Sequence, residues 1–102
     1  MDPERFEAEK YADYFPQLQQ AYKNAFNRVN ERYDAELVHA IDQQVLDESE
    51  PHYEGDGEFT MALPEDPYDR LEGVIVDREK FDAVLDAYVA EIKTELRRVF
   101  DV

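Results

Sequence analysis

The stretch 77-DREKFDAVLDAYVAEIKTELRRVF-100 carries the start, the apolar face and the end of one long helix. Asp77 has the side chain of an N-cap residue, because its carboxylate can accept hydrogen bonds from the free N–H groups of the first turn. At about 100° per residue, the apolar side chains from Phe81 to Phe100 fall in one broad sector, as a buried helix face requires. Arg97 and Arg98 oppose the negative end of the helix dipole. We therefore predict that a helix over 77–100 organises the core.

Two further helices are predicted before it. Asp2 followed by Pro3 is typical of an N-cap and a first helical residue, which predicts a helix over 3–13. Pro16 lacks a backbone N–H and disfavours helical geometry at the residue before it, so a second helix should run over 16–33. The apolar and mostly aromatic side chains from Tyr11 to Tyr33 stay within one sector across the proline. We expect this stripe to belong to the core.

The middle of the chain is predicted to hold a third helix and two strands. Residues 34–46 suit a helix capped by Asp34, although their β-branched content would also suit a strand. The charged stretch 47–58 is expected to be a connector with a turn at Asp56-Gly57. Alternation over 59–63 predicts a half-buried strand, and Val74, Ile75 and Val76 predict another. Between them, Asp66-Pro67 and Gly73 predict one short helical turn.

Together these elements predict a single domain over 1–102 of the α+β class, with three to four helices packed on a small antiparallel sheet of two or three short strands. The chain contains no internal repeat and no stretch long enough to separate two domains.

The acidic residues are concentrated in one third of the chain. The net charge is −15, and residues 34–77 hold fourteen acidic side chains against one basic side chain, Arg70. In residues 1–33 and 78–102, by contrast, the numbers of acidic and basic side chains are nearly equal. One interpretation is an acidic surface for a basic partner, and the other, which we favour, is the solvated coat of a protein from a salt-rich cytoplasm. Under either interpretation, direct binding of nucleic acid is disfavoured, because phosphate contacts need a basic face.

Composition also excludes several classes of function. The chain has no cysteine, so it has no disulfide, no thiolate metal site and no cysteine nucleophile. No run of residues is long and apolar enough for a membrane span or a signal sequence. We therefore expect a cytoplasmic protein without a membrane contact.

Glu36, His39 and Asp42 form the one candidate metal site. Glu-x-x-His places two ligands on one helix face in carboxylate-bridged metal bundles, and Asp42 lies one turn further on. Only one copy of the motif is present, so a symmetric dimer would have to supply the second. His39 is also expected to point away from the apolar face of its helix, toward solvent.

Other catalytic patterns are weak or missing. His52 lies beside Tyr53 in the acidic connector, where neighbouring carboxylates favour its charged form. The three glycines at 55, 57 and 73 cannot form a phosphate-binding loop, and Ser49 is not in a nucleophile elbow. We predict no catalytic set and no cofactor site.

Several segments carry a resemblance that covers nearly the whole chain. The start DPERFE, the run YFPQLQQAYKNAFNRVNERYDAELVHAIDQQVL, the turn EGDGEF and the end VDREKFDAVLDAYVAEIKTELRRVF resemble a small uncharacterised family from halophilic archaea. This resemblance implies no activity, and it favours the solvated-coat interpretation of the charge.

Two hypotheses of function follow from these residues. The first is a non-enzymatic interaction or assembly module. Its partner is another protein or a second copy of the same chain, which would make a homodimer. The second is a metal-dependent enzyme or regulator that uses Glu36, His39 and Asp42, or His52. A pocket that collects the histidines with buried carboxylates would favour the second hypothesis.

Overall fold

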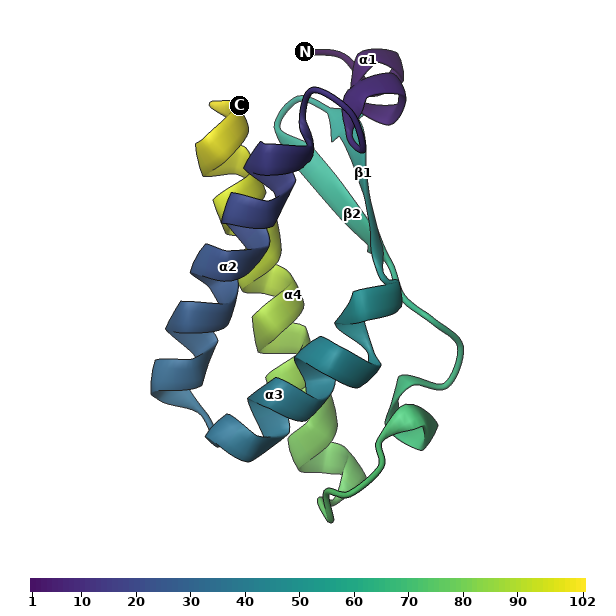
Figure 1. Ribbon diagram of the computed structural model, residues 1–102, viewed down its shortest axis with the longest axis vertical. Helices are drawn as coiled ribbons and strands as arrows, with labels where there is room; N and C mark the ends of the chain where they lie inside the picture. Colours follow the sequence, from purple (N-terminus) through teal and green to yellow (C-terminus); the bar gives the residue numbers. More distant parts are fainter.

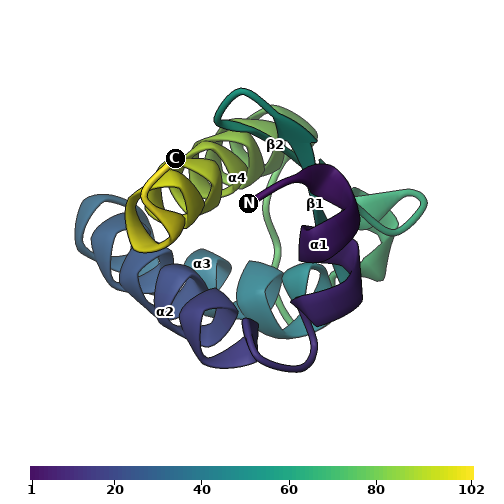
Figure 2. The ribbon, with the colours of Figure 1, turned by 90° about the horizontal axis from the view of Figure 1, so that it is seen from above.

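The computed structural model describes residues 1–102 as an elongated molecule of 41 × 26 × 21 Å whose helices and single β-hairpin surround a common core (Figure 1, Figure 2). The α-helices are α1 (Pro3–Glu9), α2 (Phe15–Arg32), α3 (Ala35–Gln44) and α4 (Arg78–Phe100). The strands are β1 (Glu50–Gly55) and β2 (Glu58–Ala62), and the short 3-10 helices are η1 (Leu46–Glu48) and η2 (Pro67–Arg70). Four helices and a two-stranded antiparallel sheet confirm the predicted α+β class.

The long C-terminal helix α4 has the predicted start and end. The Asp77 carboxylate accepts a hydrogen bond of 2.8 Å from the backbone N–H of Lys80. At the other end, Asp101 takes a left-handed conformation with φ 54°, and its N–H bonds to carbonyl groups of the last turn. The buried face comprises Phe81, Val84, Leu85, Tyr88, Ile92, Glu95 and Leu96.

Helix α2 lies beside α4, and the two helices run in opposite directions (Figure 1). The buried residues of α2 are Leu18, Ala21, Ala25 and Val29, spaced by three and four positions. Two of these four are alanines, whose small side chains allow a helix to be approached closely. Tyr22 and Phe26, which a fully buried stripe would place in the centre, are only partly buried at the edge of the core.

The junction between α1 and α2 differs from the prediction. Helix α1 ends at Glu9 instead of Asp13, and a turn follows in which the N–H groups of Ala12 and Tyr14 both bond to the Glu9 carbonyl. This tight turn changes the direction of the chain before Pro16, so the apolar stripe does not continue across it. Tyr11 is 57% exposed and Phe15 is 42% exposed. The expectation that both belong to the core is therefore wrong.

The short helix α1 is held by aromatic contacts. A seven-residue helix is marginal alone in water, so tertiary packing must fix it. Phe6 is fully buried, and its ring lies edge-on to Phe59 and Phe100 with centroid distances of 5.5 and 5.6 Å. These contacts join α1 to the hairpin and to the end of α4.

Helix α3 confirms the helical alternative for the middle segment. The Asp34 carboxylate accepts a hydrogen bond of 3.0 Å from the N–H of Glu36, as its predicted N-cap role requires. The helix ends at Gln44, and Leu37, Val38 and Ile41 are buried.

The charged connector contains a strand that the sequence patterns do not indicate. β1 pairs with β2 in an antiparallel register that places Pro51 opposite Met61 and Tyr53 opposite Phe59. The turn occurs where predicted, since Gly55, Asp56 and Gly57 all have positive φ angles. Tyr53 and Phe59 are buried on the face of the hairpin that meets the helices.

The predicted strand at Val74–Val76 is absent. These residues form an irregular loop before α4, because no second strand lies beside them to complete the hydrogen bonds of a ladder. The Tyr68 hydroxyl donates a hydrogen bond of 2.6 Å to the Val76 carbonyl instead. Val74 and Val76 pack against the core, whereas the side chain of Ile75 is fully exposed. The side chains of these three residues therefore alternate between core and solvent, as in an extended strand, although they are not part of a sheet.

Candidate functional site

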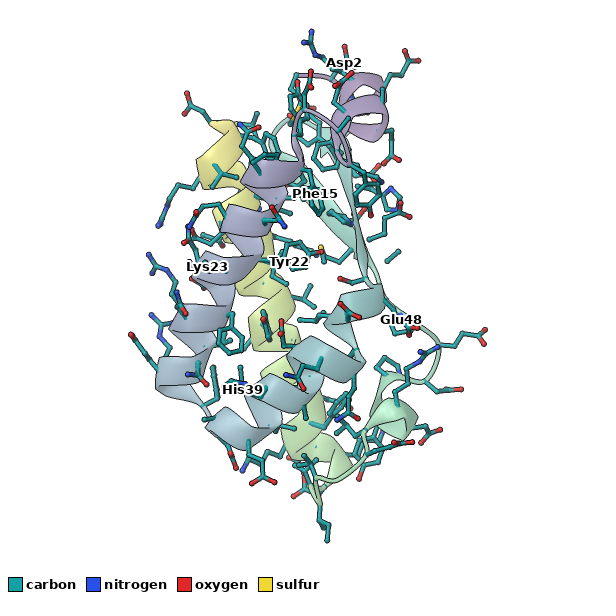
Figure 3. All side chains as sticks on the ribbon, in the orientation of Figure 1. Asp2, Phe15, Tyr22, Lys23, His39 and Glu48 are labelled. Carbon is teal, nitrogen blue, oxygen red and sulfur yellow. The ribbon has the colours of Figure 1, made fainter.

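One surface feature that combines aromatic, aliphatic and acidic side chains is an open groove of about 520 Å³, which we call the Tyr11 groove. One side is formed by the turn before α2 and by α2 itself, and the other by α3, η1 and the start of β1. Figure 3 shows Phe15, Tyr22 and Lys23 on α2; Lys23 is exposed and does not line the groove. The lining residues are Tyr11, Phe15, Leu18, Gln19, Tyr22, Asp42, Gln43, Leu46, Asp47, Ser49 and Pro51.

Two exposed aromatic rings form one rim of the groove. Tyr11 and Phe15 lie edge to face with a centroid distance of 6.3 Å. Tyr11 lies in the turn between α1 and α2, and Phe15 is the first residue of α2, so their positions result from the break in the helix. An exposed aromatic pair beside a hollow is a typical place for contact with another molecule.

The floor of the groove is apolar with one partly buried hydroxyl pair. Leu18, Leu46 and Pro51 are buried there. The Tyr22 hydroxyl lies 3.1 Å from the Ser49 hydroxyl, which donates in turn to the Leu46 carbonyl at 2.7 Å. Burial raises the pKa of Tyr22 to about 12, so the phenol is neutral at physiological pH.

Two carboxylates line the other side of the groove. Asp42 is half-buried and accepts a hydrogen bond of 2.9 Å from the Tyr88 hydroxyl, while Asp47 is exposed. Burial, together with the Asp42 carboxylate, raises the pKa of Tyr88, which keeps this donor protonated. No lysine or arginine lines the groove, and neither carboxylate has a salt bridge within the chain.

The three residues of the candidate metal site do not point to one place. Glu36 and His39 are exposed on α3, as expected for His39, whose ring lies edge-on to Phe26 at 4.9 Å. Asp42 instead bonds to Tyr88 at the groove. No group of three histidine, aspartate or glutamate side chains is placed to hold a metal ion. Metal binding by Glu36, His39 and Asp42 stays a prediction that depends on ligands from a second copy of the chain.

His52 belongs to an ionic cluster between α1 and β1, which we call the Lys10 cluster and which comprises Glu7, Lys10, Glu50 and His52. The His52 Nδ1 atom lies 2.6 Å from the Glu7 carboxylate. The Lys10 ammonium lies 2.8 Å from Glu7, 3.0 Å from Glu50 and 3.1 Å from the Pro51 carbonyl. These contacts connect α1 to β1. His52 and His39 do not line a common cavity.

Lys10 is the buried member of this cluster, only 2% exposed. Burial alone would lower the pKa of Lys10, but the hydrogen bonds to Glu7 and Glu50 outweigh it and the pKa is raised. The pKa of Glu7 is lowered, first by its hydrogen bond to Lys10 and then by that to His52. The ion pairs therefore keep both residues charged.

A second hollow, between α2 and α4, is lined by charged side chains of both signs. Buried Glu95 accepts a hydrogen bond of 3.1 Å from Asn24, and its carboxylate lies 3.4 Å from Arg28 and 3.2 Å from Arg98. The lining residues carry three positive charges, on Arg28, Arg32 and Arg98, against two negative charges, on Glu31 and Glu95, so most of the charge in this hollow is compensated within the chain.

The fold and the groove define the protein as a small acidic α+β protein with one open, aromatic-lined groove. Residues 1–102 match the family of unknown function DUF5783, and the chain belongs to this family. No curated protein and no solved structure matches the chain. None of its helices combines the length and the apolar character needed to cross a bilayer.

The Tyr11 groove and the buried Lys10 were both missed by sequence reasoning. The one sequence signal for the ion pair of Lys10 is that Lys10 follows Glu7 by three positions, the spacing of a helical ion pair. The groove had a signal too, because Tyr11 and Phe15 both lie just before the predicted break at Pro16. A break in a helix interrupts its apolar face as well as its hydrogen bonds.

Proposed function

We propose that the protein is a non-enzymatic module that binds a partner protein in the Tyr11 groove. The observation that carries this proposal is the pair of exposed rings, Tyr11 and Phe15, at the rim of an open groove. Aromatic side chains dominate the energetics of protein interfaces, and about half of the surface of each of these two rings is free to be covered. A partner would therefore gain most of its binding energy at this rim.

The ionisable groups of the groove support a binding role over a catalytic one. Tyr22 is a weak base candidate because its pKa is about 12. Asp42 is occupied by Tyr88, and no histidine lines the groove. General acid–base catalysis needs a group that titrates near the working pH. The alternative, a metal-dependent enzyme or regulator at Glu36, His39 and Asp42 or at His52, would need a second chain to complete its ligands.

We further propose that this module works in the cytoplasm of a halophilic archaeon. The concentration of carboxylates in residues 34–77, with a single arginine, is the composition that high salt tolerates best. The protein would then meet its partner under conditions that screen long-range charge. Contacts of short range, such as ring stacking, would decide recognition.

Self-association is the second form of partner that we propose. Much of the apolar surface of α2 and α4 is used within the chain, so a homodimer would have to use what remains, chiefly the groove rim. Two chains of net charge −15 repel each other, and this repulsion weakens in molar salt. Light scattering that reports a monomer at every concentration in molar potassium chloride would exclude the homodimer.

Site-specific photo-crosslinking in the native cell tests the module. A benzophenone amino acid placed at Tyr11 should give one discrete adduct, and the same probe at Lys23, which is exposed on α2 but does not line the groove, should give none (Figure 3). Adding Phe15→Ser to the Tyr11 probe should abolish the adduct. Equal crosslinking from both positions, or none from either, would overturn the proposal.

A further inference from the structure

We infer that the occupant of the Tyr11 groove is a basic segment of a partner protein, whose arginine or lysine side chain stacks on Tyr11 and Phe15 and places its positive charge beside Asp42 and Asp47. This inference rests on the proposed function, and it adds the chemistry of the partner.

An uncharged occupant would pay a desolvation cost when it covers the carboxylates of the groove. Any occupant that fills it removes water from Asp42, which is already half-buried, and from Asp47. Burying a carboxylate without a compensating charge is costly, and neither residue has a cation from its own chain. The nearby cations are already engaged, since Arg70 pairs with Glu48, and Lys10 is buried in its own cluster with its ammonium 5.5 Å from the centre of the Tyr11 ring. An apolar occupant would leave both carboxylates unpaired, whereas a cationic occupant pairs them.

The surfaces that line the groove match the parts of an arginine side chain. Arginine has an apolar stem, a flat guanidinium that stacks on aromatic rings, and a donor fork that fits a carboxylate. The groove offers the same three surfaces side by side: buried Leu18 and Leu46, the rings of Tyr11 and Phe15, and the two aspartates. Lysine offers the apolar stem and the positive charge, but it lacks the flat guanidinium and the donor fork.

The charge of the groove disfavours the other classes of occupant. Nucleic acids and anionic membrane surfaces carry the same sign of charge as the groove and as the chain as a whole. A second copy of this chain would bring a net charge of −15 to an acidic groove. A basic segment of another protein is the macromolecule that the charges of the groove favour.

Fluorescence anisotropy with defined peptides tests the inference. The probe is a labelled helical peptide of leucine, alanine and three arginines, and its matched control has citrulline, which is neutral and of nearly the same shape, in place of each arginine. We expect the arginine peptide to bind at least about tenfold more tightly, because truncated or neutralised charge pairs in a covered site cost this much or more. Titrations use the lowest potassium chloride concentration at which circular dichroism shows every variant folded.

Variants of the full chain separate groove recognition from general attraction to an acidic protein. Asp42→Asn with Asp47→Asn should weaken the arginine peptide about tenfold, while Asp66→Asn with Asp69→Asn, an equal change of charge outside the groove, should alter affinity less than about twofold. Asparagine at position 42 can still accept the hydrogen bond from Tyr88, so the fold is maintained. Equal losses in the two double variants would overturn the inference.

Two further outcomes have distinct meanings. A discrete adduct from the Tyr11 crosslinking probe, combined with equal affinity for the arginine and citrulline peptides, would overturn the basic-partner inference and leave the binding module intact. Spermidine that binds wild type more tightly than the peptide does, and that loses affinity only in the Asp42 and Asp47 variant, would assign the groove to a small cation and overturn the inference as well.

Discussion

The hydroxyl of Tyr88 on α4 donates a hydrogen bond of 2.9 Å to the carboxylate of Asp42 on α3. Tyr88 is fully buried in the core, whereas Asp42 lines the Tyr11 groove. The groove is therefore attached directly to the longest helix. Tyr88 also orients the carboxylate that we propose as a partner contact.

Tyr88→Phe should lower the free energy of unfolding by about 1.5–3 kcal/mol, the usual range for a hydrogen bond to a charged group. The ring stays in place, so only the bond to Asp42 is lost. Chemical denaturation measures the change. Tyr14→Phe is the matched control, because no hydrogen bond of its hydroxyl is present in the structure, and it should cost less than about 0.5 kcal/mol. Equal losses would show that the Tyr88 bond adds no stability.

Ile92→Ala should cost about 2–5 kcal/mol, since Ile92 is fully buried on α4 and its truncation leaves a cavity. Ile75→Ala removes the same atoms from a side chain that is fully exposed and should change stability by less than about 0.5 kcal/mol. Thermal or denaturant unfolding of both variants compares the two sites. Similar effects would mean that the face of α4 around Ile92 is not packed as described.

The Lys10 cluster predicts a pH dependence at its acidic end. The folded-state pKa of Glu7 lies below its ordinary value of 4.5, so the contribution of this carboxylate to stability is present above pH 4.5 and is lost as the pH falls through the folded value. Glu7→Gln should therefore be less stable than wild type at neutral pH, and the difference should shrink below about pH 4. Melting temperatures at several pH values measure it.

Glu4→Gln is the control for this pH series, because Glu4 is exposed on the same helix and has no salt bridge. Its difference from wild type should vary little with pH. A gap between wild type and Glu7→Gln that stays constant from neutral to acidic pH would contradict the role assigned to the cluster.

The helix starts could be predicted because capping is a local interaction. Asp2, Asp34 and Asp77 each accept a backbone hydrogen bond from a residue two or three positions ahead, so a few adjacent letters contain the whole interaction. The same holds for the turn at Gly55–Gly57. These features need no knowledge of the rest of the chain.

The strands and the groove depend on distant partners. β1 consists largely of polar residues, and it is fixed by its pairing with β2 and by ion pairs from α1 to Glu50 and His52. Val74–Val76 has the composition of a strand but lacks a neighbour. The groove brings together Tyr11 and Asp42, which are distant in sequence, so no local pattern could place them side by side.

The last prediction concerns salt and the acidic middle of the chain. Fourteen carboxylates and one arginine lie between Asp34 and Asp77, and the structure places many of them on the exposed hairpin and the loops that follow it. Their mutual repulsion destabilises the compact state at low salt. At molar ionic strength the Debye length is about 3 Å, compared with about 10 Å at 0.1 M, so repulsion between exposed groups is largely screened. Stability should therefore rise with potassium chloride concentration.

Neutralising Asp56, Glu58 and Glu65 to asparagine or glutamine should lower the salt concentration needed for folding, because all three are exposed in the acidic middle and have no salt bridge. The same number of changes at Glu4, Asp13 and Asp86, in the balanced ends, should not. Circular dichroism against potassium chloride compares the two triple variants with wild type. If both variants behave alike, or if wild type unfolds identically in low and molar salt, repulsion is not what the acidic middle contributes. Its charge is then better explained as a surface that attracts a basic partner toward the Tyr11 groove.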